Sequence, residues 1–259
     1  GPGSGSSGGG PSGSVNTNTG NRFYELPLVS WPSRGDSGVA LVLYHNSLSD
    51  WNGEFGHSWS HTYEIKVDYT AGSSAMLRWA DGSNIPYTEA SGVFTPPSGF
   101  HEKLVHNANG TWTVTTKSQR LFQFNTSGYL TSTSDRNGNS ITVTRDASAK
   151  IQNVADSSGR QLTFQYGTNG KIASITDPIG RSWTFSQDTS SNLTQINYPQ
   201  IGGSTPNRSF TYDTNHNIQT DTDLRSKTWT FVYDTSQRLT SFTNPLNHTT
   251  SYNYGTSAT

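Results

Sequence analysis

The second half of the chain repeats itself with a nearly constant period, and this repeat constrains the fold more than any other feature. Seven equivalent positions, here called anchors, follow one another at steps of 21, 21, 21, 25, 21 and 21 residues. The anchors are Phe124, Arg145, Tyr166, Gln187, Tyr212, Tyr233 and Tyr254. In each unit apolar and polar residues alternate, a polar turn follows, and a second short apolar segment ends the unit, which is the pattern of a β-hairpin. Since one hairpin cannot bury its apolar face alone, the period predicts an all-β array of stacked hairpins that forms a curved ribbon.

The positions around each anchor repeat as well. An apolar residue, usually aromatic, stands two positions before the anchor, so both side chains lie on one face of a strand. An aliphatic residue stands six positions after the anchor, and in most units a further apolar residue stands three positions later, as with Ile172 and Ile175; Thr133 and Asp221 are the exceptions. A spacing of three does not fit a regular strand, so it predicts a β-bulge or bend. Asp135, Asp156 and Asp177 open the connectors between units and are expected to cap turns.

The first part of the chain has no repeat. Residues 1–14 are rich in glycine and serine and are interpreted as a cleavage scar and flexible linker. Residues 15–116 contain short apolar segments between turn-forming residues, which predict a separate β region. Residues 117–259 form the array, with about seven units of which the last is incomplete. Two prolines exclude residues 93–99 from a central strand, and no window shows a helical period.

Two groups of residues resemble a known family. The dipeptides Tyr212-Asp213 and Tyr233-Asp234, each followed by a turn and an aliphatic residue, resemble the tyrosine-aspartate (YD) repeats of Rhs proteins. Other anchors depart from the dipeptide, and Gln187 is an example. Residues of the amino-terminal region are also similar to the segment that opens Rhs and wall-associated YD proteins. The matching residues there are Phe55, Gly56, Trp59, Ser60, His61 and Tyr63.

The resemblance implies a function as well as a fold. In Rhs proteins such ribbons form a hollow shell around a toxin or other cargo, which implies a partial shell here and a non-enzymatic, encapsulating role. It implies structural roles for the repeat residues Tyr166, Tyr212, Asp213, Tyr233, Asp234 and Tyr254 and for the motif residues Phe55, Gly56, Trp59 and His61. Intact Rhs proteins carry more repeats, a core motif with a self-cleaving aspartate and a variable tail. This chain is therefore expected to be an amino-terminal piece whose partner is the rest of its own polypeptide or an enclosed cargo.

Composition narrows the possible partners, sites and location of the chain. Seventeen basic and eighteen acidic residues give a net charge of -1, so nothing attracts nucleic acid by bulk electrostatics. The absence of cysteine excludes disulfides and thiolate metal sites. No apolar run approaches the length of a membrane span. The cysteine-free, Ser- and Thr-rich composition is typical of a secreted or cell-surface bacterial protein. An open strand edge favours pairing with a second chain, so a dimer is expected unless the edge is covered.

No group of residues predicts catalysis, a cofactor or a metal site. His57 and His61 would lie about 13 Å apart on one face of a strand, too far for one zinc ion with ligand bonds of about 2 Å. A structural role for His61 is favoured. No serine lies in a nucleophile motif, and Asp177-Pro178 lies in an ordinary connector without the self-cleavage core motif. The chain is therefore expected not to be an enzyme.

Aromatic residues leave one alternative function open. Seven tryptophans and twelve tyrosines could stack sugar rings. Tryptophans and tyrosines at repeat-equivalent positions, such as Trp183 and Tyr212, are expected to pack between units. Trp51, Trp31 and Trp112 lie outside the register of the array and are candidates for an exposed platform. The second hypothesis is therefore a carbohydrate-binding module whose ligand contacts Trp51, Trp31 and Trp112.

Overall fold

Three antiparallel sheets make up the computed structural model, which describes residues 13–33 and 38–255. The first sheet contains β1 (Ser14–Val15), β2 (Arg22–Trp31), β3 (Val39–Asn46) and β4 (Trp59–His61). The second contains β5 (Lys66–Thr70), β6 (Ser74–Arg78), β7 (Asn84–Ala90) and β8 (Val93–Thr95). The third, here called the ribbon, has fifteen strands that pair in sequence order from β9 to β23. The fold is thus all-β, as predicted.

The ribbon strands follow one another without a crossover. Their bounds are β9 (Lys103–His106), β10 (Trp112–Thr115), β11 (Leu121–Phe124), β12 (Leu130–Ser134), β13 (Ser140–Arg145), β14 (Ile151–Asp156), β15 (Gln161–Tyr166), β16 (Ile172–Thr176), β17 (Ser182–Gln187), β18 (Leu193–Asn197), β19 (Asn207–Tyr212), β20 (Ile218–Thr222), β21 (Thr228–Tyr233), β22 (Leu239–Thr243) and β23 (Thr249–Ser251). The ribbon includes the hairpin at 103–115, which lies before residue 117. It is open, with β9 at one edge and β23 at the other.

The predicted bulge is confirmed and recurs in each unit from β11 to β22. Gln165 pairs with Ser174 while the anchor Tyr166 pairs with Ile172, so Ala173 is the extra residue. The bulge explains the spacing of three, because it turns both Ile172 and Ile175 toward the core, where they are 0% and 1% exposed. The same register shift occurs between β13 and β14, β17 and β18, β19 and β20, and β21 and β22.

The turns are capped as predicted, and at both ends of the hairpins. Asp177 Oδ1 accepts the N–H groups of Ile179 and Arg181, and Asp156 accepts those of Ser158 and Arg160. The aspartates of the YD dipeptides cap the opposite turns in the same way, as Asp213 and Asp234 show. One aspartate thus orders each tight turn by satisfying two backbone donors.

Several anchor side chains donate a hydrogen bond to a backbone carbonyl group of the preceding unit. Tyr212 Oη donates to the carbonyl oxygen of Leu193 in the preceding unit at 2.7 Å. Arg145 Nε donates to Leu130 at 3.4 Å, and Gln187 Nε2 donates to Ile172 at 3.0 Å. A long side chain with a donor at its end can therefore make this bond from the anchor position, which explains why arginine and glutamine can replace tyrosine there, whereas the first anchor, Phe124, has no donor.

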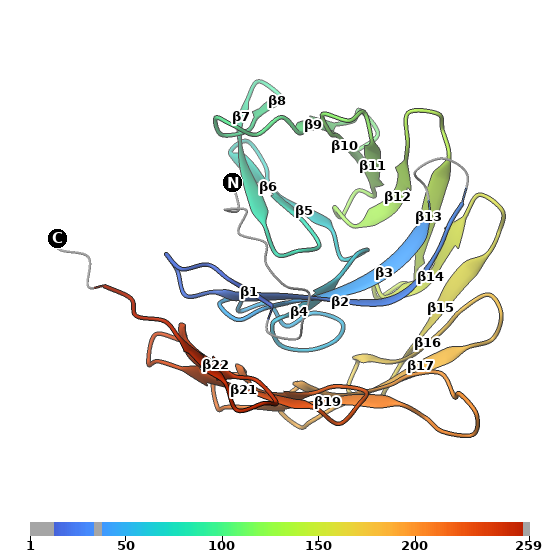
Figure 1. Cartoon of the computed structure of the whole chain (residues 1–259). Helices are drawn as coiled ribbons and strands as arrows, with labels where there is room; N and C mark the ends of the chain where they lie inside the picture. The colour runs from blue at the N-terminus through green and yellow to red at the C-terminus, as the bar shows by residue number, and fades with distance from the viewer. Residues whose placement is uncertain (1–12, 34–37, 256–259) are drawn as a thin grey trace.

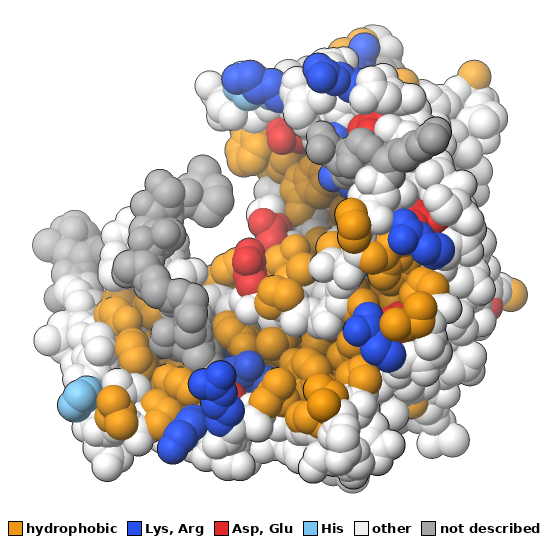
Figure 2. All heavy atoms as spheres, turned by 45° about the vertical axis from the view of Figure 1, so that its right-hand side comes forward, with side chains coloured by type: hydrophobic (Ala, Val, Ile, Leu, Met, Phe, Trp, Pro, Cys, Tyr) orange, Lys and Arg blue, Asp and Glu red, His pale blue; other side chains and the backbone are white. Residues whose placement is uncertain are grey.

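The two amino-terminal sheets lie inside the curve of the ribbon (Figure 1). The first sheet covers the inner face of the later units, where Trp59 packs on Phe210 at a ring-centroid distance of 5.3 Å. The second sheet covers the start of the ribbon, where Tyr69 packs on Trp112 at 4.9 Å. One core therefore joins all three sheets. A space-filling view shows apolar side chains gathered along the inside of this curve (Figure 2).

Two details differ from the sequence-based description. Ser14 pairs with Phe23 in β1, although it was assigned to the linker, and residues 1–12 lie outside the described part of the chain. Val93–Thr95 forms β8, whereas the two prolines in residues 93–99 favour a loop. β8 lies at the edge of its sheet, which is compatible with the prolines that follow it.

Backbone hydrogen bonds join the amino-terminal region to the ribbon at several places. They run from Val67 N to Gly128 O, from Ile172 N to Glu54 O, from His57 N to Ser191 O and from Leu239 N to Gly20 O, at 2.8 to 3.0 Å. Glycines stand at three of these contacts because no side chain fits. A Cβ atom on Gly128 would lie 1.8 Å from Val67 O, and one on Gly56 would lie 2.3 Å from Ser191 O.

Candidate functional site

The segment between β3 and β5, residues 47–65, carries the motif residues and lies between the first sheet and the ribbon. Trp59 is fully buried, and its indole N–H donates to Tyr212 Oη at 2.9 Å. Phe55 is also fully buried and packs on Phe185 at a centroid distance of 4.9 Å. These contacts hold a long segment against two repeat units. Residues 47–65 are called the docking loop below.

A buried charge network fixes the middle of the docking loop. The N–H of Tyr63 donates to His61 Nδ1 at 3.4 Å, so His61 Nε2–H donates to Glu54 Oε2 at 2.9 Å. Arg145 Nη1 lies 3.8 Å from Glu54 Oε1. Although burial opposes ionisation of Glu54, the hydrogen bond from His61 and the nearby charge of Arg145 lower the pKa of this carboxyl. Glu54 is thus the ionised member of the network.

Glu64 is the second carboxyl beside His61 and has a different environment. Its Oε1 accepts from the Trp51 indole at 3.0 Å and from the backbone N–H of Glu54 at 3.3 Å. Its Oε2 is buried, and no hydrogen-bond partner for it is present in the described part of the chain. Burial raises the pKa of Glu64 to about 7, and the Glu54 carboxylate adds to the shift. Two carboxyls near one imidazole thus prefer different protonation states.

Lys171 reaches the docking loop from the ribbon turn before β16. Its Nζ lies 2.5 Å from Asn52 Oδ1, 2.7 Å from Gly53 O and 3.4 Å from Asn52 O. Burial lowers the pKa of Lys171, against the opposing charges of Glu64 and Glu54. The amide nitrogen of Asn52 lies 3.2 Å from His57 Nε2. The ring of His57 stacks on His216 of the ribbon at a centroid distance of 3.8 Å.

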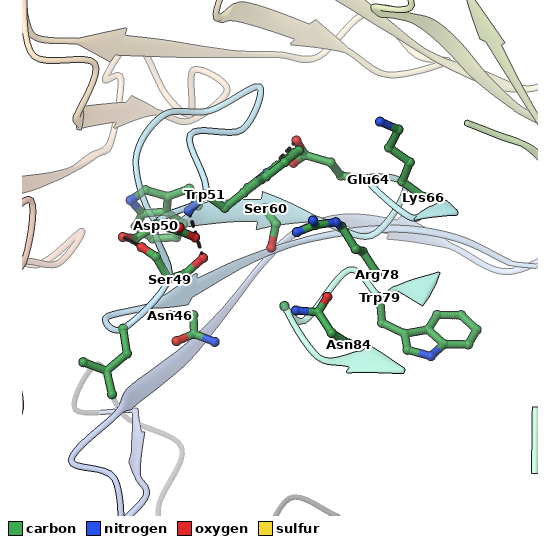
Figure 3. A pocket seen from close by; sticks show the side chains of 14 residues that line it. Asn46, Ser49, Asp50, Trp51, Ser60, Glu64, Lys66, Arg78, Trp79 and Asn84 are labelled. Atoms are coloured by element: carbon green, nitrogen blue, oxygen red, sulfur yellow. Dashed lines mark hydrogen bonds between the residues drawn. The ribbon is translucent and has the colours of Figure 1, made fainter. Parts of the chain in front are cut away.

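Trp51 stands at the rim of a pocket of about 200 Å³ beside this network. Arg78 and Asn84, from β6 and β7, face Ser60 and Asn46 across the pocket (Figure 3). Trp51 is 38% exposed, and the Arg78 guanidinium lies 5.8 Å from the centre of its ring. An exposed indole among amide and hydroxyl groups offers one flat apolar surface and several polar contacts.

The other two candidate tryptophans do not join Trp51 in a platform. Trp112 is 2% exposed, stacks on His106 at 4.0 Å and lies in the core, so it does not form an exposed surface. Trp31 is half-buried and donates its indole N–H to Asp156 Oδ2 at 3.0 Å. Unlike Trp51, these two residues pack between sheets, because the amino-terminal sheets fill the inside of the curve.

The repeat-motif residues have structural contacts. Tyr166, Tyr212 and Tyr233 pack against the core, and Tyr254 Oη donates to Leu239 O at 2.5 Å. His57 and His61 do not share a strand, since β4 begins at Trp59. Among the described residues no group of three or more His, Cys, Asp and Glu side chains is placed to hold a metal ion. Nor does that part of the chain contain a helix long and apolar enough to cross a membrane.

The sequence did not single out Glu54, Glu64, Asn52 or Lys171. Their partners are far away in the chain, and Lys171 is 119 residues from Asn52. The available signal was the concentration of two glutamates and two histidines within eleven residues of a segment that otherwise resembled a structural motif. Such a cluster is chemically unusual in a loop that packs against a core.

The amino-terminal sheets match one family model. A domain of unknown function, DUF6531, matches residues 12–87, which span β1 to β6 and part of β7. No curated protein matches the chain.

Several solved structures are similar to this chain at low sequence identity. The Tc holotoxin pore of Photorhabdus luminescens with a mutated TccC3 matches at 12% identity and a TM-score of 0.41, over 90% of this chain and 14% of that one. A complex of TcdB2, TccC3 and Cdc42 matches at 11% identity and 0.41, over 89% and 15%. TcdB2-TccC3 without its hypervariable carboxy-terminal region matches at 12% and 0.41, over 90% and 15%. The chain thus spans about one seventh of the chains it matches.

Proposed function

We propose that this chain is a non-enzymatic wall segment of a secreted or cell-surface Rhs/YD-type protein, in which an extended ribbon surrounds a cargo. The observation that carries the proposal is the ribbon itself, with fifteen strands in sequence order and its inner face covered by the amino-terminal sheets. The YD-type repeat and the Phe55 to Tyr63 motif support the assignment of the chain to the Rhs/YD type. In this proposal the motif residues hold the amino-terminal region against the ribbon and do not bind a substrate.

A wall segment of this kind grows by adding strands at an open edge. β23 pairs with β22 on one side only, and Thr249, Thr250 and Ser251 are exposed. The N–H of Tyr252 is bonded inward to Thr240 O, so the N–H of Ser251, one residue earlier, points to the open edge. The partner at this edge is a further strand of the same polypeptide or, for the isolated chain, a second copy.

The experiment is light scattering of the isolated chain over a range of concentrations. We expect a species of twice the chain mass at high concentration, because an unpaired edge recruits another strand. Ser251→Pro removes an outward donor without breaking the ladder to β22, so this variant is expected to stay monomeric with an unchanged circular dichroism spectrum. A wild-type chain that is monomeric at every concentration would contradict growth at β23.

Carbohydrate binding is a second candidate, and the exposed Trp51 ring in its polar pocket favours it. Sugar rings stack on flat aromatic faces while their hydroxyls bond to amide and charged groups, which Asn46, Asn84 and Arg78 supply here. Of the three candidate tryptophans only Trp51 lines this pocket, since Trp112 is buried in the core and Trp31 bonds to Asp156.

Titration of the intrinsic tryptophan fluorescence with cell-wall and plant polysaccharides tests this candidate. A saturable shift that is lost in Trp51→Ala and retained in Trp31→Ala is the expected result for a carbohydrate site in the pocket. If none of the polysaccharides produces a saturable shift, or if Trp51→Ala keeps it, this pocket is not the binding site.

A further inference from the structure

The contact between Lys171 and Asn52 joins a nucleophile to an electrophile. The Lys171 Nζ lies 2.5 Å from Asn52 Oδ1, and since a C=O bond is about 1.2 Å long, the amide carbon lies within about 3.7 Å of Nζ. Reacting atoms in a near-attack arrangement are typically about 3–3.5 Å apart. We propose that Lys171 and Asn52 form a covalent amide bond that ties the docking loop to the ribbon.

The reaction is an exchange of one amine for another at the amide carbon. The neutral Lys171 amine attacks Asn52 Cγ, a bond forms between Nζ and Cγ, and the bond between Cγ and Nδ2 breaks. One proton moves from Nζ to Nδ2, and ammonia leaves. The products are a secondary amide and ammonia, so atoms and electrons balance without an oxidant, a reductant or a co-reactant.

Burial makes the neutral amine that this attack requires easier to reach. Burial lowers the pKa of Lys171. Glu64 lines the same cavity of about 240 Å³ as Asn52 and Lys171, and burial raises its pKa to about 7. The charges of Glu64 and Glu54 oppose the shift at Lys171, and a protonated Glu64 removes one of them and is a source of the proton that the departing nitrogen needs.

The backbone and a histidine hold Asn52 in place. Asn52 and His57 pair as an isolated β-bridge, and Gly53 and Gly56 exchange backbone hydrogen bonds at 3.2 Å between them. His57 Nε2 lies 3.2 Å from Asn52 Nδ2, the nitrogen that leaves, and is placed to relay a proton to it. Gly53 is required here, since a Cβ atom would lie 2.7 Å from Glu64 Oε1. The electrophile is thus preorganised against Lys171.

Intact mass spectrometry of the purified chain tests the bond directly. The wild-type chain is expected to weigh less than its sequence by the mass of one ammonia, and a tryptic digest should contain one branched peptide that joins Asn52 to Lys171. Asn52→Ala and Lys171→Arg are expected to have their full sequence masses. Lys150→Arg is the matched control, since Lys150 lines the same cavity without contacting an asparagine amide, and it should keep the mass deficit.

Glu64→Gln separates chemistry from position. In freshly synthesised chains followed by intact mass over time, this variant is expected to develop the mass deficit about a hundredfold more slowly than the wild type. The wild-type mass decides the proposal without any variant. A folded wild-type chain that keeps its full sequence mass after prolonged incubation overturns it, and Lys171 is then a hydrogen-bond donor only. The bond is independent of the proposed wall function, which the light-scattering experiment tests.

Discussion

Asp221→Ala is expected to lower the free energy of unfolding by about 3–5 kcal/mol, because it leaves a buried arginine without its counter-charge. Asp221 is 0% exposed, and both of its oxygens accept from Arg208, at 2.8 Å from Nε and 2.7 Å from Nη2. The Arg208 guanidinium lies 5.2 Å from the ring centre of the buried Tyr24, so water cannot replace the lost partner. Denaturant unfolding followed by tryptophan fluorescence measures the loss.

A double variant distinguishes loss of charge pairing from loss of packing. The same two positions hold Leu162 and Ile175 in an earlier unit, so Arg208→Leu with Asp221→Ile restores the apolar pair of that unit. Replacing a buried ion pair by apolar residues of similar volume is often neutral or stabilising. The double variant is therefore expected to unfold at a denaturant concentration close to that of the wild type. Equal destabilisation of the single and double variants would show that packing, and not the unpaired charge, dominates.

Gly128→Ala is expected to destabilise the chain by about 2–5 kcal/mol, through overpacking and backbone strain together. The backbone at Gly128 has φ of 78°, and an added Cβ atom would lie 1.8 Å from Val67 O. This contact joins β5 to the turn before β12, where Val67 N–H donates to Gly128 O at 2.9 Å. The substitution must therefore open the contact between the second sheet and the ribbon.

Gly138→Ala is the matched control for this effect. Gly138 occupies the next turn with φ of 80°, and a Cβ atom there would have nothing within 4 Å. It should cost only the strain of placing alanine at positive φ, about 1 kcal/mol. Equal losses of unfolding free energy for the two alanine variants would mean that the contact with Val67 contributes nothing.

The sequence was sufficient to predict those features of the ribbon that depend on local interactions. The aspartate caps, the bulge between Ile172 and Ile175 and the face shared by each anchor and its preceding aromatic residue are set within one unit. The period therefore reveals them. The tolerance of the anchor position became clear only from the structure, because the acceptor of Arg145 or Gln187 belongs to the preceding unit.

The contacts of the amino-terminal region could not be predicted in the same way. Trp112 was expected to be exposed because it lies outside the repeat register, yet it is covered by β5 and β8, which come earlier in the chain. Glu54 and Lys171 have partners about a hundred residues away, and no local pattern specifies such distances. One signal was available for the ion pair: Arg208 and Asp221 depart together, within a single unit, from positions that are apolar in the three units before it. The first unit has a polar pair there too, Arg120 and Thr133, which are also joined by a hydrogen bond.

The backbone bonds between the amino-terminal region and the ribbon also imply an order of assembly. Three of them are nested along the chain, since Val67 to Gly128 lies within Glu54 to Ile172, which lies within Gly20 to Leu239. Closing the innermost loop first shortens the span that each later closure must bridge, which lowers its entropic cost. During synthesis Gly20 is made long before its partner Leu239. The segment around Gly20 is therefore expected to be the last part of the amino-terminal region to bond to the ribbon.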